Sequence, residues 1–156
     1  MDWSKAEKVL EVKNLCLPKA GGGYLVDHVS FDLKKGEILG IYGLMGAGRS
    51  EIFECLMGLH PEHTGEVYLE GEKLNIKSIS GQIDKGFALI PEDRQAQGLV
   101  QTMDIEKNCS LSAMKTYKKA GVFLDSSKEG QKVDEQIKDI HIKAVSYTHL
   151  RAHETT

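Results

Sequence analysis

The feature that most constrains the fold is a glycine-rich stretch, ILGIYGLMGAGRSEIFECL, which runs from Ile38 to Leu56. An apolar, β-branched run precedes the glycines, and a run with apolar residues at helical spacing follows them. The spacing of Gly43, Gly48 and Ser50 is that of G-x-x-x-x-G-[K]-[ST], except that arginine stands at the lysine position. The pattern therefore predicts a buried strand, a phosphate-binding loop and a helix in direct succession.

Each residue type in this loop has a chemical reason to lie beside phosphate. Glycine permits positive φ angles and brings backbone N–H groups close to oxygen atoms, and the start of a helix attracts anions. Ser50 is placed to hold Mg²⁺ through its hydroxyl, whereas Arg49 supplies a planar, permanent charge in place of a compact ammonium group. We therefore expect nucleotide binding with weak hydrolysis. The residues expected to contact the nucleotide here are Gly43, Leu44, Met45, Gly46, Ala47, Gly48, Arg49, Ser50 and Glu51.

An alternative for the same stretch is a glycine-rich turn that merely lets a strand pack on a helix. We favour the phosphate loop because the apolar run before it and the helical pattern after it are both in place.

Composition narrows the possible functions. A chain of 156 residues is long enough for one domain with a core. Its 20 Lys and Arg against 23 Asp and Glu give a net charge of −3, which does not suggest nucleic acid as a partner. No apolar run in the sequence is long enough to cross a bilayer, so we expect any membrane role to go through a partner protein. The three cysteines form no CxxC pair and favour free thiols over a disulfide framework.

Further elements are expected on both sides of the loop. Alternating segments at 9–17 and 25–33 predict antiparallel strands, and the apolar runs at 37–43 and 87–90 predict buried strands. The remaining predicted elements are a hairpin over 65–74 with its turn near Glu70–Gly71, and helices over 52–58, 78–86, 104–114 and 135–142.

Four segments taken together resemble the ATP-binding-cassette (ABC) transporter ATPases: LEVKNL, VSFDLKKGEILGIYGLMGAGRSE, GEVYLEGEKL and GFALIPEDRQAQGLV. More narrowly, GLMGAGRSE and PEDR…GLV resemble the second cassette of the tandem ATPases of ribose-, galactose- and xylose-type sugar importers. The resemblance runs from about residue 10 to about residue 143. It implies an α/β phosphate-loop NTPase core with an antiparallel β subdomain, truncated before the helical subdomain and the Walker B strand.

The resemblance also implies residue roles. In cassettes a glutamine that meets Mg²⁺ and the membrane subunit occupies the position of Glu92, so Glu92 joins Ser50 as a predicted Mg²⁺ ligand. A carboxylate can coordinate a metal but cannot donate as an amide does. A solvated acidic turn is the alternative for Glu92. Tyr24 is the candidate for stacking on adenine, and no catalytic residue is predicted, because the segment that carries the hydrolytic carboxylate in cassettes is not found here.

Two functions follow from this resemblance. The first is the ATP-binding subunit of an ABC importer that couples ATP binding and hydrolysis to monosaccharide uptake, with this chain expected to be inactive alone. The alternative is a non-catalytic nucleotide-binding module that supports a partner cassette. A small kinase or GTPase is less favoured, because no guanine-reading NKxD segment occurs.

The first function implies ATP and Mg²⁺ as ligands. Its expected partners are a second cassette, integral membrane permease subunits and, indirectly, a periplasmic or lipid-anchored sugar-binding protein. Its expected location is cytoplasmic, peripheral on the inner face of the cell membrane.

The end of the sequence breaks the pattern. Residues 1–144 are predicted to form a partial ABC ATPase domain, whereas VSYTHLRAHETT, over 145–156, has no apolar period and resembles adapter-derived sequence. We expect this tail to be foreign to the domain or disordered. Metal binding at His149 and His153, or at Cys55 with His60 and His63, is the less favoured interpretation of those residues.

Overall fold

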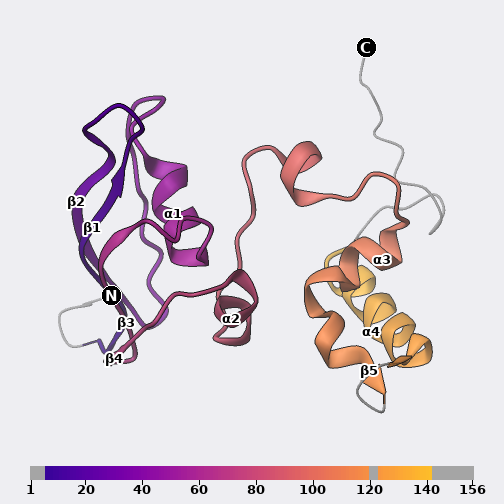
Figure 1. The fold of residues 1–156 in the computed structure, drawn as a ribbon. Coiled ribbons are helices and arrows are strands. Elements are labelled where there is room, and N and C mark those ends of the chain that lie inside the picture. The colour runs from indigo at the N-terminus through magenta and orange to yellow at the C-terminus, as the bar shows by residue number, and fades with distance from the viewer. Residues whose placement is uncertain (1–5, 120–122, 142–156) are drawn as a thin grey trace. The chain divides into compact units, whose positions relative to one another are not determined.

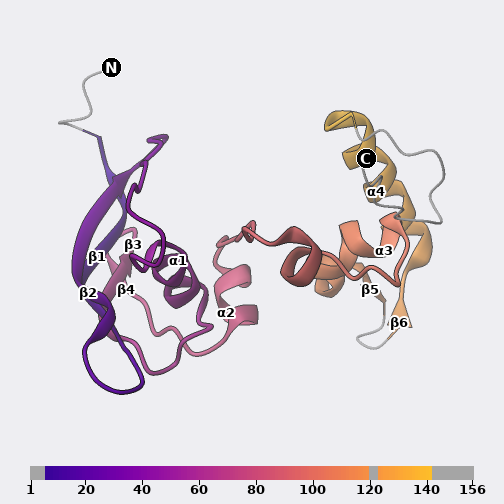
Figure 2. The ribbon, with the colours of Figure 1, turned by 90° about the horizontal axis from the view of Figure 1, so that it is seen from above.

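The computed structural model describes residues 6–119 and 123–141, and the chain divides into two compact units between Leu89 and Ile90. Figures 1 and 2 show the elements of both units. The first unit contains β1 (Lys8–Pro18), β2 (Tyr24–Lys34), α1 (Arg49–Met57), β3 (Thr64–Leu69), β4 (Glu72–Lys73) and α2 (Ile79–Asp84). The second contains a π-helical turn (Arg94–Gly98), α3 (Ile105–Ser110), a 3₁₀ helix (Leu111–Tyr117), β5 (Lys118–Lys119), β6 (Phe123–Leu124) and α4 (Ser126–Asp139).

The first unit is built on an antiparallel sheet with the strand order β2-β1-β3-β4. The central strand, β1, pairs with β2 along one edge and with β3 along the other. This confirms the two early strands and the antiparallel sheet that their alternating patterns predicted. The predicted hairpin turn is also confirmed, since Glu70 and Gly71 have φ angles of 50° and 83° between β3 and β4.

The apolar face of β1 changes parity along the strand. Leu10 and Val12 are buried, and the next core residues are Leu15 and Leu17, so the period of two is interrupted once. The interruption coincides with a register shift between Val12 and Leu15 and with the left-handed conformation of Asn14, whose φ is 49°. An extra residue in a strand moves all later side chains to the opposite face. The bulge therefore keeps both halves of β1 on one core.

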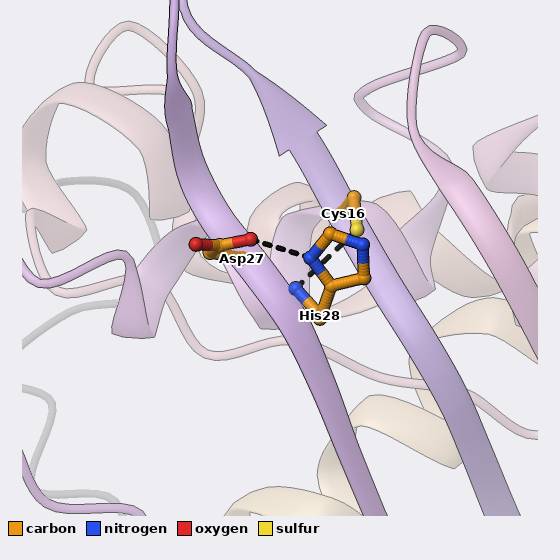
Figure 3. Close-up of side chains that lie close together, drawn as sticks. All are labelled: Cys16, Asp27 and His28. Atoms are coloured by element: carbon orange, nitrogen blue, oxygen red, sulfur yellow. Dashed lines mark hydrogen bonds and ion pairs between the residues drawn. The ribbon is translucent and has the colours of Figure 1, made fainter.

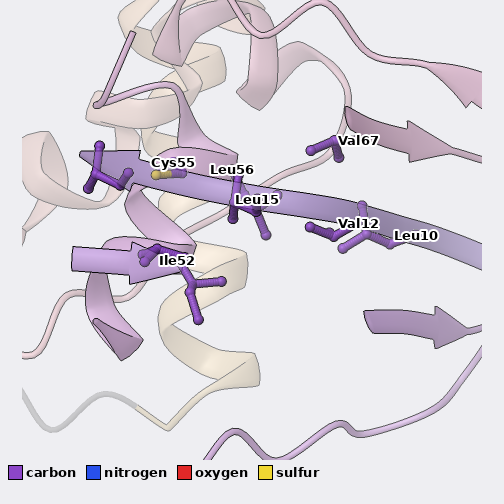
Figure 4. Packing of buried hydrophobic residues seen from close by; sticks show 9 residues of the cluster. Leu10, Val12, Leu15, Ile52, Cys55, Leu56 and Val67 are labelled. Atoms are coloured by element: carbon purple, nitrogen blue, oxygen red, sulfur yellow. The ribbon is translucent and has the colours of Figure 1, made fainter. Parts of the chain in front are cut away.

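Helix α1 supplies the other side of this core. Its buried residues Ile52, Cys55 and Leu56 pack with the apolar face of the sheet (Figure 4). Gly58 ends the helix with a φ of 81°, as its sequence position predicted. Phe53, which belongs to the same apolar run, is 41% exposed.

The two predicted buried strands at 37–43 and 87–90 are not present. Both segments lack regular structure, and Ile38, Tyr42 and Ile90 are 97%, 96% and 93% exposed. A strand exists through hydrogen bonds to neighbouring strands, and within the described residues no strand pairs with either segment. The prediction of strands from apolar, β-branched composition alone was therefore wrong for both segments.

The helices predicted over 78–86 and 104–114 begin as expected, with Ser78 and Asp104 as their N-caps. The side-chain oxygen of Ser78 accepts from the Gly81 N–H at the start of α2, and that of Asp104 accepts from the Lys107 N–H at the start of α3. The last helix was predicted over 135–142, but α4 begins at Ser126, where Asp125 caps it by accepting from the Lys128 N–H. The predicted tail at 145–156 lies outside the described residues.

Candidate phosphate-binding site

The glycine-rich loop reaches α1 through two left-handed residues. Gly46 and Gly48 have φ angles of 77° and 81°, which few other residues adopt without strain. The Ala47 N–H donates to the Leu44 carbonyl at 3.1 Å and closes the loop on itself. Gly48 caps α1 without a side-chain hydrogen bond, and the Ile52 N–H begins the helical pattern by donating to the Gly48 carbonyl. The loop thus leads into the amide end of a helix, where anions are stabilised.

Gly48 also has a packing role that the motif did not reveal. A Cβ atom at this position would lie 2.1 Å from the Leu25 carbonyl oxygen, closer than real Cβ atoms come to any neighbour. The end of the loop is therefore pressed against the backbone of β2. Sequence reasoning assigned Gly48 to phosphate approach alone, because the partner that crowds it lies far away in the sequence.

Arg49 lies back along the loop. A Cβ atom on Gly43 would lie 3.4 Å from the Arg49 Cδ atom, so the aliphatic part of the arginine runs beside the first glycine of the motif. The residue is half-buried, whereas its neighbour Ser50 is exposed. The aliphatic stem that carries the guanidinium group therefore lies against the start of the loop.

The rest of the loop is open. Leu44 and Met45 are exposed, and nothing lies within 4 Å of the position that a Cβ atom on Gly46 would occupy. Space beside Gly46, a free hydroxyl-bearing side chain at Ser50 and the charge of Arg49 together fit a phosphate group. The structure thus brings the predicted residues Gly43–Glu51 into one open loop and helix start.

Glu92 belongs to the second unit. It is exposed, and the adjacent Asp93 accepts from the backbone N–H groups of Gln95 and Ala96, each at 3.0 Å, at the start of the π-helical turn. Because the loop lies in the first unit, a shared role of Glu92 and Ser50 at Mg²⁺ stays a prediction. Tyr24, the adenine-stacking candidate, is half-exposed on β2 and packs edge-to-face on His28, with 5.7 Å between the ring centroids.

The segment with Cys55, His60 and His63 is structural in character. Cys55 is fully buried in the core, and burial raises the pKa of its thiol to about 11. Burial disfavours protonation of His60, but hydrogen bonds to Glu54 and Glu62 outweigh it and raise the pKa of this imidazole. His63 directs Nδ1 to the His60 carbonyl. The three side chains are thus engaged in separate contacts.

The family model described as "ABC transporter" matches residues 26–156. The chain belongs to the ABC transporter family. Its sequence is 42% identical, over 86% of its length, to the xylose import ATP-binding protein XylG of Photobacterium profundum. It is 38% identical, over 92% of its length, to the ribose import ATP-binding protein RbsA of Rhodopirellula baltica.

The chain spans about a quarter of these two relatives, 27% and 28% of their lengths. Among solved structures, it resembles the ATP-binding cassette MJ0796 in a dimeric post-hydrolysis state bound to ADP and Pi, with a TM-score of 0.68. That match is 21% identical and covers 90% of this chain and 60% of the other. Together with the family match, this likeness confirms the fold class, an ABC ATPase domain with an antiparallel sheet and helices. In the described ranges, no helix combines the length and apolar character that crossing a membrane requires.

Proposed function

We propose that this chain is the nucleotide-binding part of an ATPase that powers import of a monosaccharide. The observation that carries the proposal is the open loop from Gly43 to Glu51, which leads into the amide end of α1 with Arg49 folded back along it. Similarity to proteins named for xylose and ribose import supports the substrate class. Residues 1–144 are proposed as a partial cassette domain that works on the inner face of the membrane with a second cassette and permease subunits.

Different residues of the loop bind different parts of ATP. Backbone N–H groups around Gly46 and Gly48 contact phosphate oxygens, and the Arg49 guanidinium binds two oxygens of one phosphate group in a forked contact. Ser50 would hold Mg²⁺ through its hydroxyl group. The metal, when bound, neutralises charge on the phosphates during transfer.

A second candidate function is a nucleotide-binding module that does not hydrolyse ATP but supports a partner cassette. Arg49 favours it, because a long planar side chain cannot place a point charge where lysine does. The two candidates predict the same binding by this chain and differ in whether this site hydrolyses ATP in the assembled transporter.

Binding is tested by the shift in melting temperature that ATP and Mg²⁺ cause in the full chain, since a ligand bound to the folded state stabilises it. Gly46→Ala should reduce or abolish the shift. Gly71→Ala is the matched control, because Gly71 is also left-handed, at 83°, and also has no atom within 4 Å of its Cβ position. An ATP shift that is equal in both variants would refute the phosphate site.

Turnover is tested separately with Arg49→Lys. We expect this variant to bind ATP at least as tightly as the original chain and to show no steady-state hydrolysis, because phosphoryl transfer also needs an oriented water and further acidic residues. Hydrolysis by purified Arg49→Lys above that of an inactive Gly46→Ala preparation would contradict this expectation without affecting the binding result.

A further inference from the structure

A second bulge between β1 and β2 brings three potential metal ligands together. Leu15 pairs with Val29 and Leu17 pairs with Val26, so Cys16 alone faces two residues of β2, Asp27 and His28. Bulges of this kind redirect side chains and are common beside functional sites. His28 also has a left-handed backbone, with a φ of 49°, which is uncommon for a residue with a side chain.

The side chains gather over the two strands (Figure 3). One ligand atom from each of Cys16, Asp27 and His28 lies within 4.8 Å of the other two. His28 Nδ1 lies 2.6 Å from the Asp27 carboxylate, and the His28 backbone N–H donates to the Cys16 sulfur at 3.3 Å. Cys16 is buried, whereas Asp27 and His28 are exposed, so the thiol forms the floor of a site that opens to solvent.

The donor set is specific for one class of ion. A thiolate, an imidazole and a carboxylate together suit Zn²⁺ and similar transition metals, whereas Mg²⁺ and Ca²⁺ prefer oxygen ligands alone. Zinc bonds to these donors are about 2.0–2.3 Å long, so tetrahedral ligands lie about 3.3–3.8 Å apart. The His28 Nδ1 and Asp27 carboxylate atoms, which lie 2.6 Å apart, have to separate by roughly 0.7–1 Å. Any pair of ligand atoms near the 4.8 Å limit has to approach by roughly 1 Å.

We propose that Cys16, Asp27 and His28 form a zinc site with three protein ligands and a fourth position open to water. On binding, the Cys16 thiol gives its proton to solvent and releases its hydrogen bond to the Asn14 carbonyl. The carboxylate exchanges its contact with the imidazole for a contact with the metal. The site lies on the β1–β2 hairpin and uses none of the residues of the loop from Gly43 to Glu51.

The test is titration of the full, reduced chain with Co²⁺, followed by thiolate-to-cobalt charge-transfer absorption in the near ultraviolet. We expect saturation at one equivalent and loss of the band when Zn²⁺ is added. His28→Gln and Asp27→Asn should each weaken Co²⁺ binding by at least about tenfold, as loss of a ligand or its support does. Both side chains are exposed, so neither change disturbs the core, and melting without metal verifies this.

Two control variants make the result specific. His60→Gln removes a histidine that contacts carboxylates but no thiol, and Cys109→Ser removes a different thiol; both should leave the titration unchanged. Histidines elsewhere in the chain cannot produce the band, because it requires a thiolate. Absence of the band in the original chain overturns the proposal. So does a band that persists unchanged in His28→Gln and Asp27→Asn, or one that is lost in Cys109→Ser.

Discussion

Strand β1 and the segment 37–43 have similar composition, but only β1 forms a strand. Both contain runs of apolar and β-branched residues, and either could form a strand by propensity. In β1, Leu15 is completely buried between two paired neighbours, β2 and β3. In 37–43, Ile38 and Tyr42 are almost completely exposed. The difference teaches that pairing partners, rather than composition, decide whether an apolar run becomes a strand.

The same rule applies to a charged side chain in the second unit. Glu129 is buried, with 1% of its side chain exposed, although carboxylates rarely leave water. Ser110 donates to it at 2.5 Å and Lys107 at 2.9 Å, so its oxygens have partners. A partnered charge is thus buried in this protein, while an unpartnered apolar run is not.

The contrast between β1 and the segment 37–43 is tested by shortening one side chain in each of them. Leu15→Ala should lower the free energy of unfolding of the first unit by about 2–5 kcal/mol, because it leaves a cavity in the core between the sheet and α1. Chemical denaturation followed by circular dichroism measures this loss. A change below that range would mean that the core around β1 is already loose.

The next largest effect separates the two left-handed glycines of the loop. Gly48→Ala should lower the free energy of unfolding by about 2–5 kcal/mol, the sum of about 1–2 for the left-handed conformation and about 1–3 for overlap with the Leu25 carbonyl. Gly46→Ala should cost only about 1–2 kcal/mol, since its surroundings are empty. Equal losses in paired denaturation curves would show that contact with β2 is not what holds the loop end.

The buried carboxylate gives the second unit a dependence on pH. Hydrogen bonding from Ser110, joined by Lys107, lowers the pKa of Glu129 from its ordinary value of 4.5 and outweighs the opposing effect of burial. The stabilisation that ionised Glu129 gives to the folded state is therefore complete above about pH 4.5. It is lost as the pH falls through the lower pKa that this group has in the folded state. Glu129→Gln should lower the free energy of unfolding by about 1–3 kcal/mol near neutral pH. It should also weaken the fall in stability of the second unit at acidic pH.

Hydrogen exchange of the α3 and α4 amides at several pH values reports on this unit alone. The control is Glu135→Gln on the exposed side of α4, which should leave the exchange rates almost unchanged. If the stability of this unit falls equally steeply with acid in the Glu129→Gln protein, the pH dependence comes from other groups.

The smallest effect is expected in the unpaired segment. Tyr42→Ala removes a large aromatic side chain but should change the free energy of unfolding by less than about 0.5 kcal/mol, because that side chain is 96% exposed. The same denaturation experiment as for Leu15→Ala measures it. A loss above about 1 kcal/mol would show that the segment packs in solution and would remove the contrast with β1.

The sequence by itself determined several features that rest on local chemistry. Spacing of glycine and serine residues identified the loop from Gly43 to Ser50, alternation identified β1 and β2, and the capping residues Ser78 and Asp104 marked two helix starts. The combined motifs also identified the family. These features depend on neighbours a few residues apart, which a sequence displays directly.

Tertiary structure alone decided the features that depend on distant partners. The crowding of Gly48 comes from Leu25, and the burial of Glu129 comes from Ser110 and Lys107. Cys16 faces both Asp27 and His28 because the pairing register of β1 and β2 shifts between Leu15 and Leu17. The hairpin brings these residues near one another, but neither strand's sequence alone predicts the bulge. Burial and pairing are properties of two segments at once, so the chain had to fold before they were fixed.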